Sequence, residues 1–128
     1  MTNDYNHIMR MTAAEREARM LEKLTSEGWT VSAKGPRCCI CGCTIPTVSA
    51  PDGQPTGIGR NNPAPIAADD GSVCCATCNE KYVLPARVGK VHGSAAALLT
   101  LADRMRADGC ERVAVQAVFD LADAAIVE

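Results

Sequence analysis

Two short cysteine motifs organise this chain of 128 residues: Cys38-Cys39-Ile40-Cys41-Gly42 and Cys75-Ala76-Thr77-Cys78-Asn79. In each motif, two residues separate a pair of cysteines, so both sulfurs can point at one ion from a tight turn. Two such pairs supply the four thiolates of a closed, tetrahedral structural zinc site. The sequence therefore predicts one Zn²⁺ held by Cys38, Cys41, Cys75 and Cys78.

The other four of the eight cysteines leave alternatives for the ligand set. Spacing alone excludes neither Cys43 nor Cys74 as a ligand. Cys39 is a third substitute, although its pairing with Cys41 would leave a single intervening residue, which makes a poorer clip for zinc. We expect Cys110 to be a buried free thiol, because an unpaired cysteine behaves as a small apolar side chain.

Cysteine usage also indicates the compartment. The N-terminus is too polar for a secretory signal peptide, and no run of about 18 apolar residues predicts a membrane span. In a reducing cytosol, many cysteines indicate metal binding rather than disulfides. We therefore expect a soluble, cytoplasmic protein.

Proline and glycine divide the chain into three segments. All seven prolines lie between Pro36 and Pro85, and eight of the ten glycines lie between Gly35 and Gly93. Because proline interrupts helices, the ends are predicted to be helical and the middle to consist of loops and short strands. The predicted fold class is α+β: a small zinc-ribbon or treble-clef-like module flanked by helices. Its three parts are an N-terminal helical segment, the zinc module and a C-terminal antiparallel helical hairpin, over residues 1–30, 31–92 and 93–128.

The N-terminal segment carries local helix signals. Thr12 and Glu15 have the spacing of a capping box, in which each side chain satisfies a free backbone amide of the other residue. Gly28 is suited to a left-handed cap after the last turn. The alternation that follows, over residues 29–32, predicts a short strand, with Trp29 as an anchor in the core.

The C-terminal segment is predicted to form two helices. Ser94 is a suitable N-cap for a helix over residues 95–107, and Gly109 separates it from a second helix over residues 111–126. Each helix has an apolar stripe: Leu98, Leu101, Ala102 and Met105 on the first, and Ala114, Val118, Leu121, Ala125 and Ile126 on the second. A short turn between two such helices predicts a hairpin.

Three apolar residues lie off the second stripe: Val113, Val115 and Phe119. They need cover from the rest of the chain or from another protein. We therefore predict association through this hairpin, with a second copy or with a protein partner. In the alternative, the N-terminal helix and Trp29 supply all of the cover.

Four stretches together resemble a group of small uncharacterised phage and prophage proteins. They are Cys38-Cys39-Ile40-Cys41-Gly42, Gly57-Ile58-Gly59-Arg60-Asn61-Asn62-Pro63-Ala64-Pro65-Ile66, Cys74-Cys75-Ala76-Thr77-Cys78-Asn79 and Val83-Leu84-Pro85-Ala86-Arg87. The resemblance covers residues 37–88 and implies a bacterial host cell, but it implies no activity. More distantly, a knuckle followed by a Cys-x-x-Cys-Asn motif at a helix start looks like the treble-clef zinc fold of HNH endonucleases.

The chain departs from HNH enzymes at the residues that perform the chemistry. Those nucleases need a histidine general base and further metal ligands at the scissile phosphate. The only two histidines here, His7 and His92, lie outside the motifs. The sequence therefore predicts a protein that is not an enzyme.

The charge distribution leaves two classes of partner. The formal net charge is −2, which excludes a strongly basic nucleic-acid binder. The middle segment has a local positive balance, and it supplies the candidates for contact with phosphate or a partner: Lys34, Arg37, Arg60, Asn61, Asn62, Lys81, Arg87 and Lys90. We expect a zinc-stabilised, phage-type, protein-binding adaptor or inhibitor of a host factor. The alternative is a small nucleic-acid-binding zinc protein that uses the basic middle segment.

Overall fold

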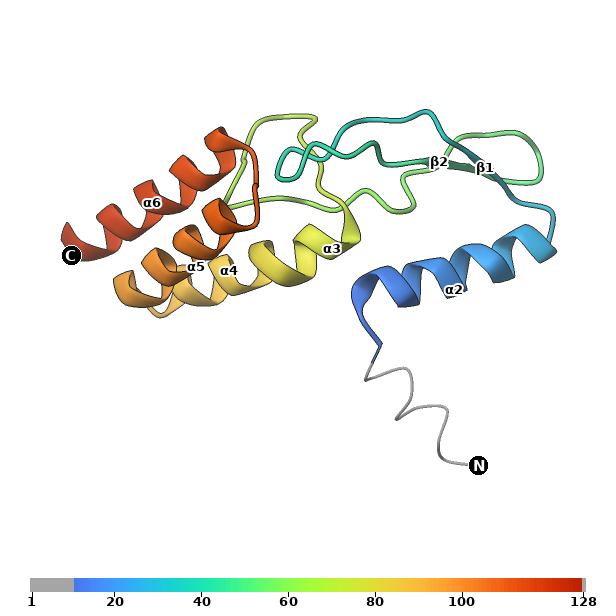
Figure 1. Cartoon of the computed structure of the whole chain (residues 1–128). Helices are drawn as coiled ribbons and strands as arrows, with labels where there is room; N and C mark the ends of the chain where they lie inside the picture. Colours follow the sequence, from blue (N-terminus) through green and yellow to red (C-terminus); the bar gives the residue numbers. More distant parts are fainter. Residues whose placement is uncertain (1–10, 128) are drawn as a thin grey trace, which may run out of the picture.

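The architecture comes from a computed structural model that describes residues 11–127. Residues 1–10 of the predicted N-terminal segment, including His7, lie outside the described part. The order of elements is α2 (Ala13–Ser26), β1 (Thr30–Ser32), β2 (Thr47–Ser49), α3 (Ala76–Cys78), the π-helix η1 (Asn79–Val83), α4 (Leu84–Val91), α5 (Ala95–Ala107) and α6 (Arg112–Val127). The predicted α+β class is confirmed. The helices α4, α5 and α6 gather at one end of the molecule, and the sheet lies at the other (Figure 1).

Helix α2 forms as its caps predict. The Oγ1 atom of Thr12 accepts a hydrogen bond from the Glu15 amide at 3.2 Å, and the Glu15 carboxylate accepts one from the Thr12 amide at 3.1 Å. Gly28 follows the helix with a φ of +98°, in the left-handed region that glycine adopts without strain. No residue of α2 is fully buried. An ion pair of 2.7 Å between Arg16 and Glu80 joins this helix to η1.

The sheet is a single antiparallel pair, in which Val31 lies opposite Val48. Val48 is buried, whereas all three residues of β1 are exposed. The expectation that Trp29 anchors the core is wrong, because Trp29 is only half-buried and lies outside the core cluster. Its neighbours explain the difference: α2 before it has no buried residue, and β1 after it is exposed. Trp29 thus lies between two elements that contribute no buried residue to the core.

The middle segment contains a helix where the proline and glycine distribution predicted loops and short strands. The chain is helical from Ala76 to Val91, through α3, η1 and α4, although Pro85 lies within this stretch. The Leu84 amide donates to the Asn79 carbonyl five residues earlier, which is the wider π pattern. This wide turn comes directly before Pro85, where a regular α-helix would need the N–H that proline lacks. The prediction of loops and short strands alone is therefore wrong for residues 76–91.

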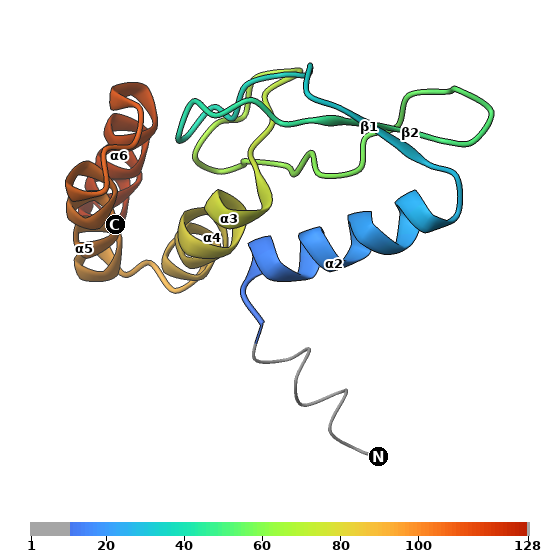
Figure 2. The same cartoon turned by 45° about the vertical axis from the view of Figure 1, so that its right-hand side comes forward.

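The core lies between the cysteine loops and the C-terminal helices. All four residues of the predicted stripe on α5 are buried. On α6, Ala114 and Val118 are buried, Leu121 and Ala125 are half-buried, and Ile126 is exposed. The two helices pack against each other, joined by a short turn (Figure 2). Buried residues of the cysteine loops, such as Ile40, belong to the same core cluster.

One backbone hydrogen bond fastens the helical turn to the first cysteine motif. The Glu111 amide donates to the Ile40 carbonyl at 2.6 Å. The loop of Cys38 and Cys41 is therefore held against the α5–α6 turn by a backbone hydrogen bond as well as by apolar contacts. Among the helices of residues 11–127, none combines the length and apolarity needed to cross a membrane.

Candidate metal centre

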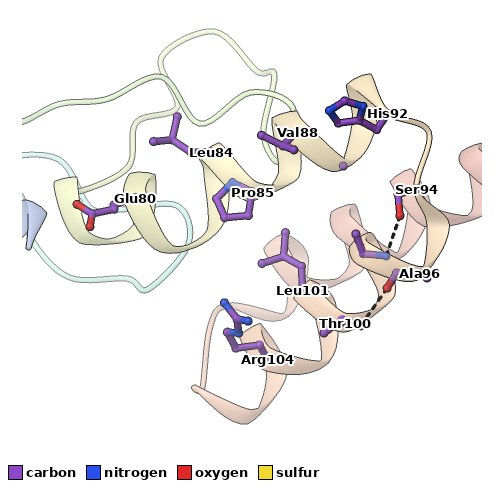
Figure 3. A pocket seen from close by; sticks show the side chains of 12 residues that line it. Glu80, Leu84, Pro85, Val88, His92, Ser94, Ala96, Thr100, Leu101 and Arg104 are labelled. Atoms are coloured by element: carbon purple, nitrogen blue, oxygen red, sulfur yellow. Dashed lines mark hydrogen bonds between the residues drawn. The ribbon is translucent and has the colours of Figure 1, made fainter.

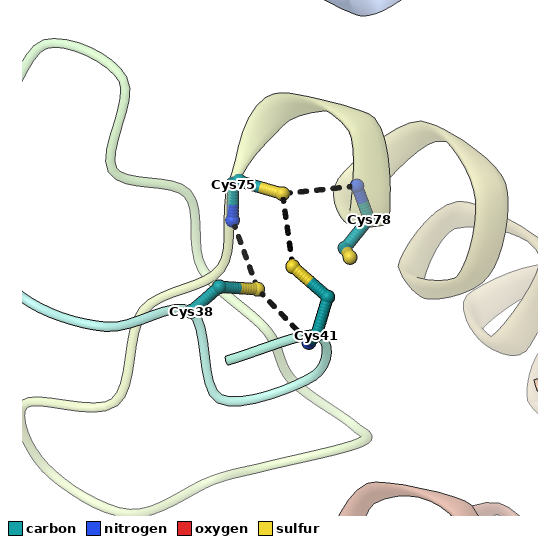
Figure 4. Close-up of side chains that lie close together, drawn as sticks. All are labelled: Cys38, Cys41, Cys75 and Cys78. Atoms are coloured by element: carbon teal, nitrogen blue, oxygen red, sulfur yellow. Dashed lines mark hydrogen bonds between the residues drawn. The ribbon is translucent and has the colours of Figure 1, made fainter. Parts of the chain in front are cut away.

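Four cysteine sulfurs come together in the structure (Figure 4). The Sγ atoms of Cys38, Cys41, Cys75 and Cys78 all lie within 4.8 Å of one another, and this group can hold a metal ion. Two of the sulfurs come from the loop before β2, and two come from the N-cap and last residue of α3. The residues predicted as ligands from their spacing are thus the ones that the fold brings together.

Backbone amides shape the first half of the site. The amides of Ile40 and Cys41 both point at the Cys38 sulfur, at 3.4 and 3.5 Å. The loop closes through hydrogen bonds from the Cys38 amide to the Cys43 carbonyl and from the Gly42 amide to the Cys38 carbonyl. Gly42 has a φ of +79°, and a Cβ there would lie 2.6 Å from the Glu111 carboxylate. Glycine is therefore required at this turn.

The second half of the site is the start of a helix. Cys75 is the N-cap of α3, and its sulfur accepts a hydrogen bond from the Cys78 amide at 3.5 Å. The Cys75 amide crosses to the other half and donates to the Cys38 sulfur at 3.3 Å. The sulfurs of Cys41 and Cys75 are 3.9 Å apart. Each half therefore supplies N–H donors that stabilise negative charge on the sulfurs.

The loops that present the two halves are themselves paired. Asn61 and Cys74 exchange two backbone hydrogen bonds, of 3.0 and 2.9 Å, as an isolated antiparallel bridge. The Cys39 amide donates to the Val73 carbonyl at 2.9 Å. These contacts align the chain before Cys75 with the chain around Cys38. Asn61, a candidate for phosphate contact, thus has a structural role beside the metal centre.

The four thiols lose their protons more easily when a cation lies between them. Hydrogen bonds from the thiols of Cys75 and Cys78 lower the pKa of Cys38, so Cys38 is the first to become a thiolate. The same interactions raise the pKa of Cys78, because its proton is held between two sulfurs. Without a cation, the cluster thus accumulates negative charge only with difficulty. A divalent ion would supply the missing positive charge.

The alternative ligands lie outside the four-sulfur group. Burial raises the pKa of Cys74 to about 12, which keeps it a neutral thiol near pH 7. Burial also raises the pKa of Cys39. Cys43 is exposed, and its pKa is raised to about 12 by partial desolvation and by the neighbouring Cys41 sulfur. The predicted free thiol of Cys110 is half-buried and packs against the core.

Three of the candidate cations donate hydrogen bonds within the middle segment. Arg37 donates to the Gly42 carbonyl at 2.9 Å, and Arg60 donates to the Thr47 hydroxyl at 3.2 Å. Arg87 donates to the carbonyls of Ala64 and Asn62, at 2.8 and 2.9 Å. The side chain of Asn62 accepts a hydrogen bond from the Ala64 amide. The remaining candidates, Lys34, Lys81 and Lys90, are exposed.

The candidate interface residues have three different environments. Val113 is 82% exposed. Phe119 is half-buried against the core, and the Arg106 guanidinium lies 5.8 Å from its ring centroid. Val115 is buried in the chain's own core, so it offers no surface to a partner. The chain itself therefore covers Val115, but its core cluster contains no residue of α2 and not Trp29, so the cover expected from these two is wrong for Val115.

The sequence analysis missed one buried polar contact near the metal centre. Tyr82 is buried, and its hydroxyl donates to a carboxylate oxygen of Asp108 at 2.5 Å. Burial, and then this hydrogen bond, raises the pKa of Tyr82. No local sequence pattern indicates this contact, because it joins residues 26 positions apart.

Replacing Tyr82 by phenylalanine should lower the free energy of unfolding by about 1–2 kcal/mol, because a hydrogen bond to a charged acceptor is lost. The raised pKa stabilises the folded state below pH 10, and this contribution decreases as unfolded tyrosine ionises above about pH 10. Absorbance at 295 nm, compared between wild type and Tyr82→Phe, measures the titration. A tyrosinate signal from native Tyr82 near pH 10 would contradict the expectation.

No protein-family model, curated protein or solved structure matches this chain, so its function is inferred from the geometry of the cysteine site and of the surface around it.

Proposed function

We propose that the chain is a zinc-stabilised, non-catalytic adaptor that binds a protein partner in a bacterial cytoplasm. The observation that carries the metal assignment is the group of four cysteine sulfurs within 4.8 Å of one another. Four thiolates are the typical ligand set of closed structural zinc sites, whereas catalytic zinc keeps one position open for water or substrate. Zinc would therefore be a structural crosslink, called the zinc staple below, and would take no part in a reaction.

The proposed staple joins the two parts of the fold that carry the core. It would connect the loop of Cys38 and Cys41 to the helix that begins at Cys75. A knuckle, an inserted loop and a second cysteine pair at a helix start is also the order found in treble-clef modules, and we propose that comparison for residues 31–92. The eight cysteines are all free, which agrees with a reducing compartment.

The protein should not cut nucleic acid. His92, the histidine that the described residues contain, lies at the end of α4 in the groove beside α5, away from the cysteine-lined pocket. Incubation with plasmid and RNA across Mg²⁺, Mn²⁺ and Ni²⁺ should leave both substrates intact, because no histidine of residues 11–127 lines the cysteine pocket as a general base. Metal-dependent cleavage that Asn61→Ala or Asn62→Ala abolishes would overturn the non-catalytic assignment.

The partner-binding part of the proposal is supported by an apolar face on α4. Leu84, Val88 and Val91 are spaced four and three residues apart, so they share one face, and Val88 and Val91 are 58% and 81% exposed. Leu84 and Val88 also line a groove of about 850 Å³ between α4 and α5 (Figure 3). Exposed apolar faces beside a groove are typical of protein-binding surfaces.

Matched variants on two apolar surfaces test this role. Val88→Asp places a charge in the middle of the α4 face, and Val113→Asp places one on a valine of α6 that is even more exposed, at 82% against 58%. Affinity capture from a bacterial lysate with wild type and both variants should lose one defined protein only for Val88→Asp. Equal capture by all three zinc-loaded proteins would contradict binding through α4.

The nucleic-acid alternative is tested by the salt dependence of binding. Phosphate contacts release counterions, so the affinity for random DNA or RNA would fall steeply with salt concentration. Three of the six candidate cations donate hydrogen bonds to backbone carbonyls or to a threonine hydroxyl. We therefore expect the protein to bind DNA and RNA weakly, with an affinity that changes little with salt concentration.

A further inference from the structure

The metal centre has a closed side and an open side. Cys38 and Cys78 are buried, Cys75 is half-buried, and Cys41 is exposed. A pocket of about 510 Å³ reaches the sulfurs from the open side. Five of the eight cysteines line it, namely Cys41, Cys43, Cys75, Cys78 and Cys110. A small solute can therefore approach Cys41 without any movement of the core.

A cysteine outside the ligand group lies next to the exposed ligand. Cys43 is exposed, lines the same pocket as Cys41, and is separated from it by Gly42 alone. Gly42 turns the chain with its φ of +79°, so the two flanking cysteines are presented on one tight turn. Cys43 belongs neither to the four-sulfur group nor to the core cluster, and its thiol lies beside the Cys41 sulfur.

We propose that Cys41 and Cys43 form a peroxide-sensitive dithiol, whose oxidation to a disulfide removes one ligand from the metal centre. This inference rests on the proposed zinc site. The oxidant is a small hydroperoxide such as hydrogen peroxide, which a pocket of this size admits.

The reaction balances in two steps. The Cys41 thiolate attacks one oxygen of the peroxide, the O–O bond breaks, and Cys41 becomes a sulfenic acid while the other oxygen leaves as hydroxide. The Cys43 sulfur then attacks the Cys41 sulfur, the S–O bond breaks, and the oxygen leaves as water with the Cys43 proton. One thiolate and one thiol together lose two electrons, and one peroxide is reduced to one hydroxide and one water.

Loss of Cys41 would affect more than the metal. Only three thiolates would remain, and the loop that contains Cys41 also receives the Glu111 amide through Ile40. Oxidation would therefore loosen the contact between the first cysteine loop and the α5–α6 turn. Oxidation of the pocket cysteines would in this way weaken a contact that positions the helical end of the molecule.

The experiment uses the purified full chain after its zinc content has been measured. Hydrogen peroxide is added, released zinc is followed with a chromophoric chelator, and free thiols are alkylated before the disulfide is mapped by mass spectrometry. Wild type should release its zinc, show a Cys41–Cys43 disulfide, and bind zinc again after reduction with dithiothreitol. Cys110→Ser, which alters the same pocket, should behave like wild type.

Cys43→Ser removes the second thiol but none of the proposed ligands. Its Cys41 should proceed to sulfinic acid, which dithiothreitol does not reduce, so most of its zinc binding should be lost permanently. Cys43→Ala gives the same test without a hydroxyl. A disulfide between other cysteines in wild type, or full zinc recovery by both Cys43 variants, would overturn the proposal. Wild type that contains no metal before oxidation would instead contradict the zinc centre, while the mapped disulfide still tests the pair.

Discussion

Replacing Cys75 by serine should abolish stoichiometric zinc binding and unfold the central segment. The change removes one of four ligands, whereas the serine hydroxyl can still cap α3 by accepting the Cys78 amide. Structural zinc contributes about 10–16 kcal/mol of apparent binding free energy in zinc-finger peptides near pH 7, whereas whole domains are stable by only about 5–15 kcal/mol. The core of this chain contains few aromatic residues, so it cannot compensate for the loss of even part of this binding free energy.

The measurement is metal analysis of purified protein together with circular dichroism. Cys39→Ser is the matched control, because Cys39 lies beside a ligand but outside the four-sulfur group. The control should retain about one zinc per chain, and a chelator should reproduce the effect of Cys75→Ser on wild type. Full zinc occupancy in Cys75→Ser would reject the ligand assignment.

Loss of the metal should also destabilise the C-terminal helices. One core cluster joins Cys38, Ile40 and Cys78 to Leu98 and Met105 of α5. Part of the helical signal should remain after chelation, because α2 and the α5–α6 pair carry their own caps and turns. The cooperative thermal transition should nevertheless broaden, since the helices lose the layer that covers their apolar faces.

The predictions that the structure confirms depend on residues close together in sequence. A capping box needs only Thr12 and Glu15, and the start of α5 needs only Ser94, whose hydroxyl accepts from the Ala97 amide. The two cysteine pairs are equally local, since each places its sulfurs within one turn of chain. Each of these features satisfies backbone or metal geometry without reference to the rest of the fold.

The predictions that failed depend on contacts between distant segments. Val115 is buried because the bond from Glu111 to Ile40 brings the first cysteine loop to the start of α6, and helix periodicity contains no information about that loop. Trp29 is half-buried for the converse reason, since α2 and β1 on either side of it contribute no buried residue. The helix around Pro85 was missed because a π-turn, which has no composition signal, precedes the proline.

The second large effect is expected for Leu98→Ala, at the contact between α4 and α5. Leu98 is fully buried, and Gly89 of α4 faces it so closely that a Cβ on that glycine would lie 2.9 Å from a Leu98 methyl carbon. Helices that approach this closely have little room to shift into a cavity. The substitution should therefore cost about 2–5 kcal/mol, which is the range for leucine-to-alanine changes in rigid cores.

Leu99→Ala is the matched control, because the neighbouring leucine has the same size on the same helix but is 37% exposed. It should cost less than about 1 kcal/mol. Denaturant unfolding of zinc-saturated protein, with the metal content measured before and after, compares the two variants under the same ligation. A small effect of Leu98→Ala, no larger than that of Leu99→Ala, would mean that metal ligation rather than helix packing holds α5 in place. A large effect with zinc still bound would show that the staple and the helical core stabilise the fold separately, as their different positions in the core cluster imply.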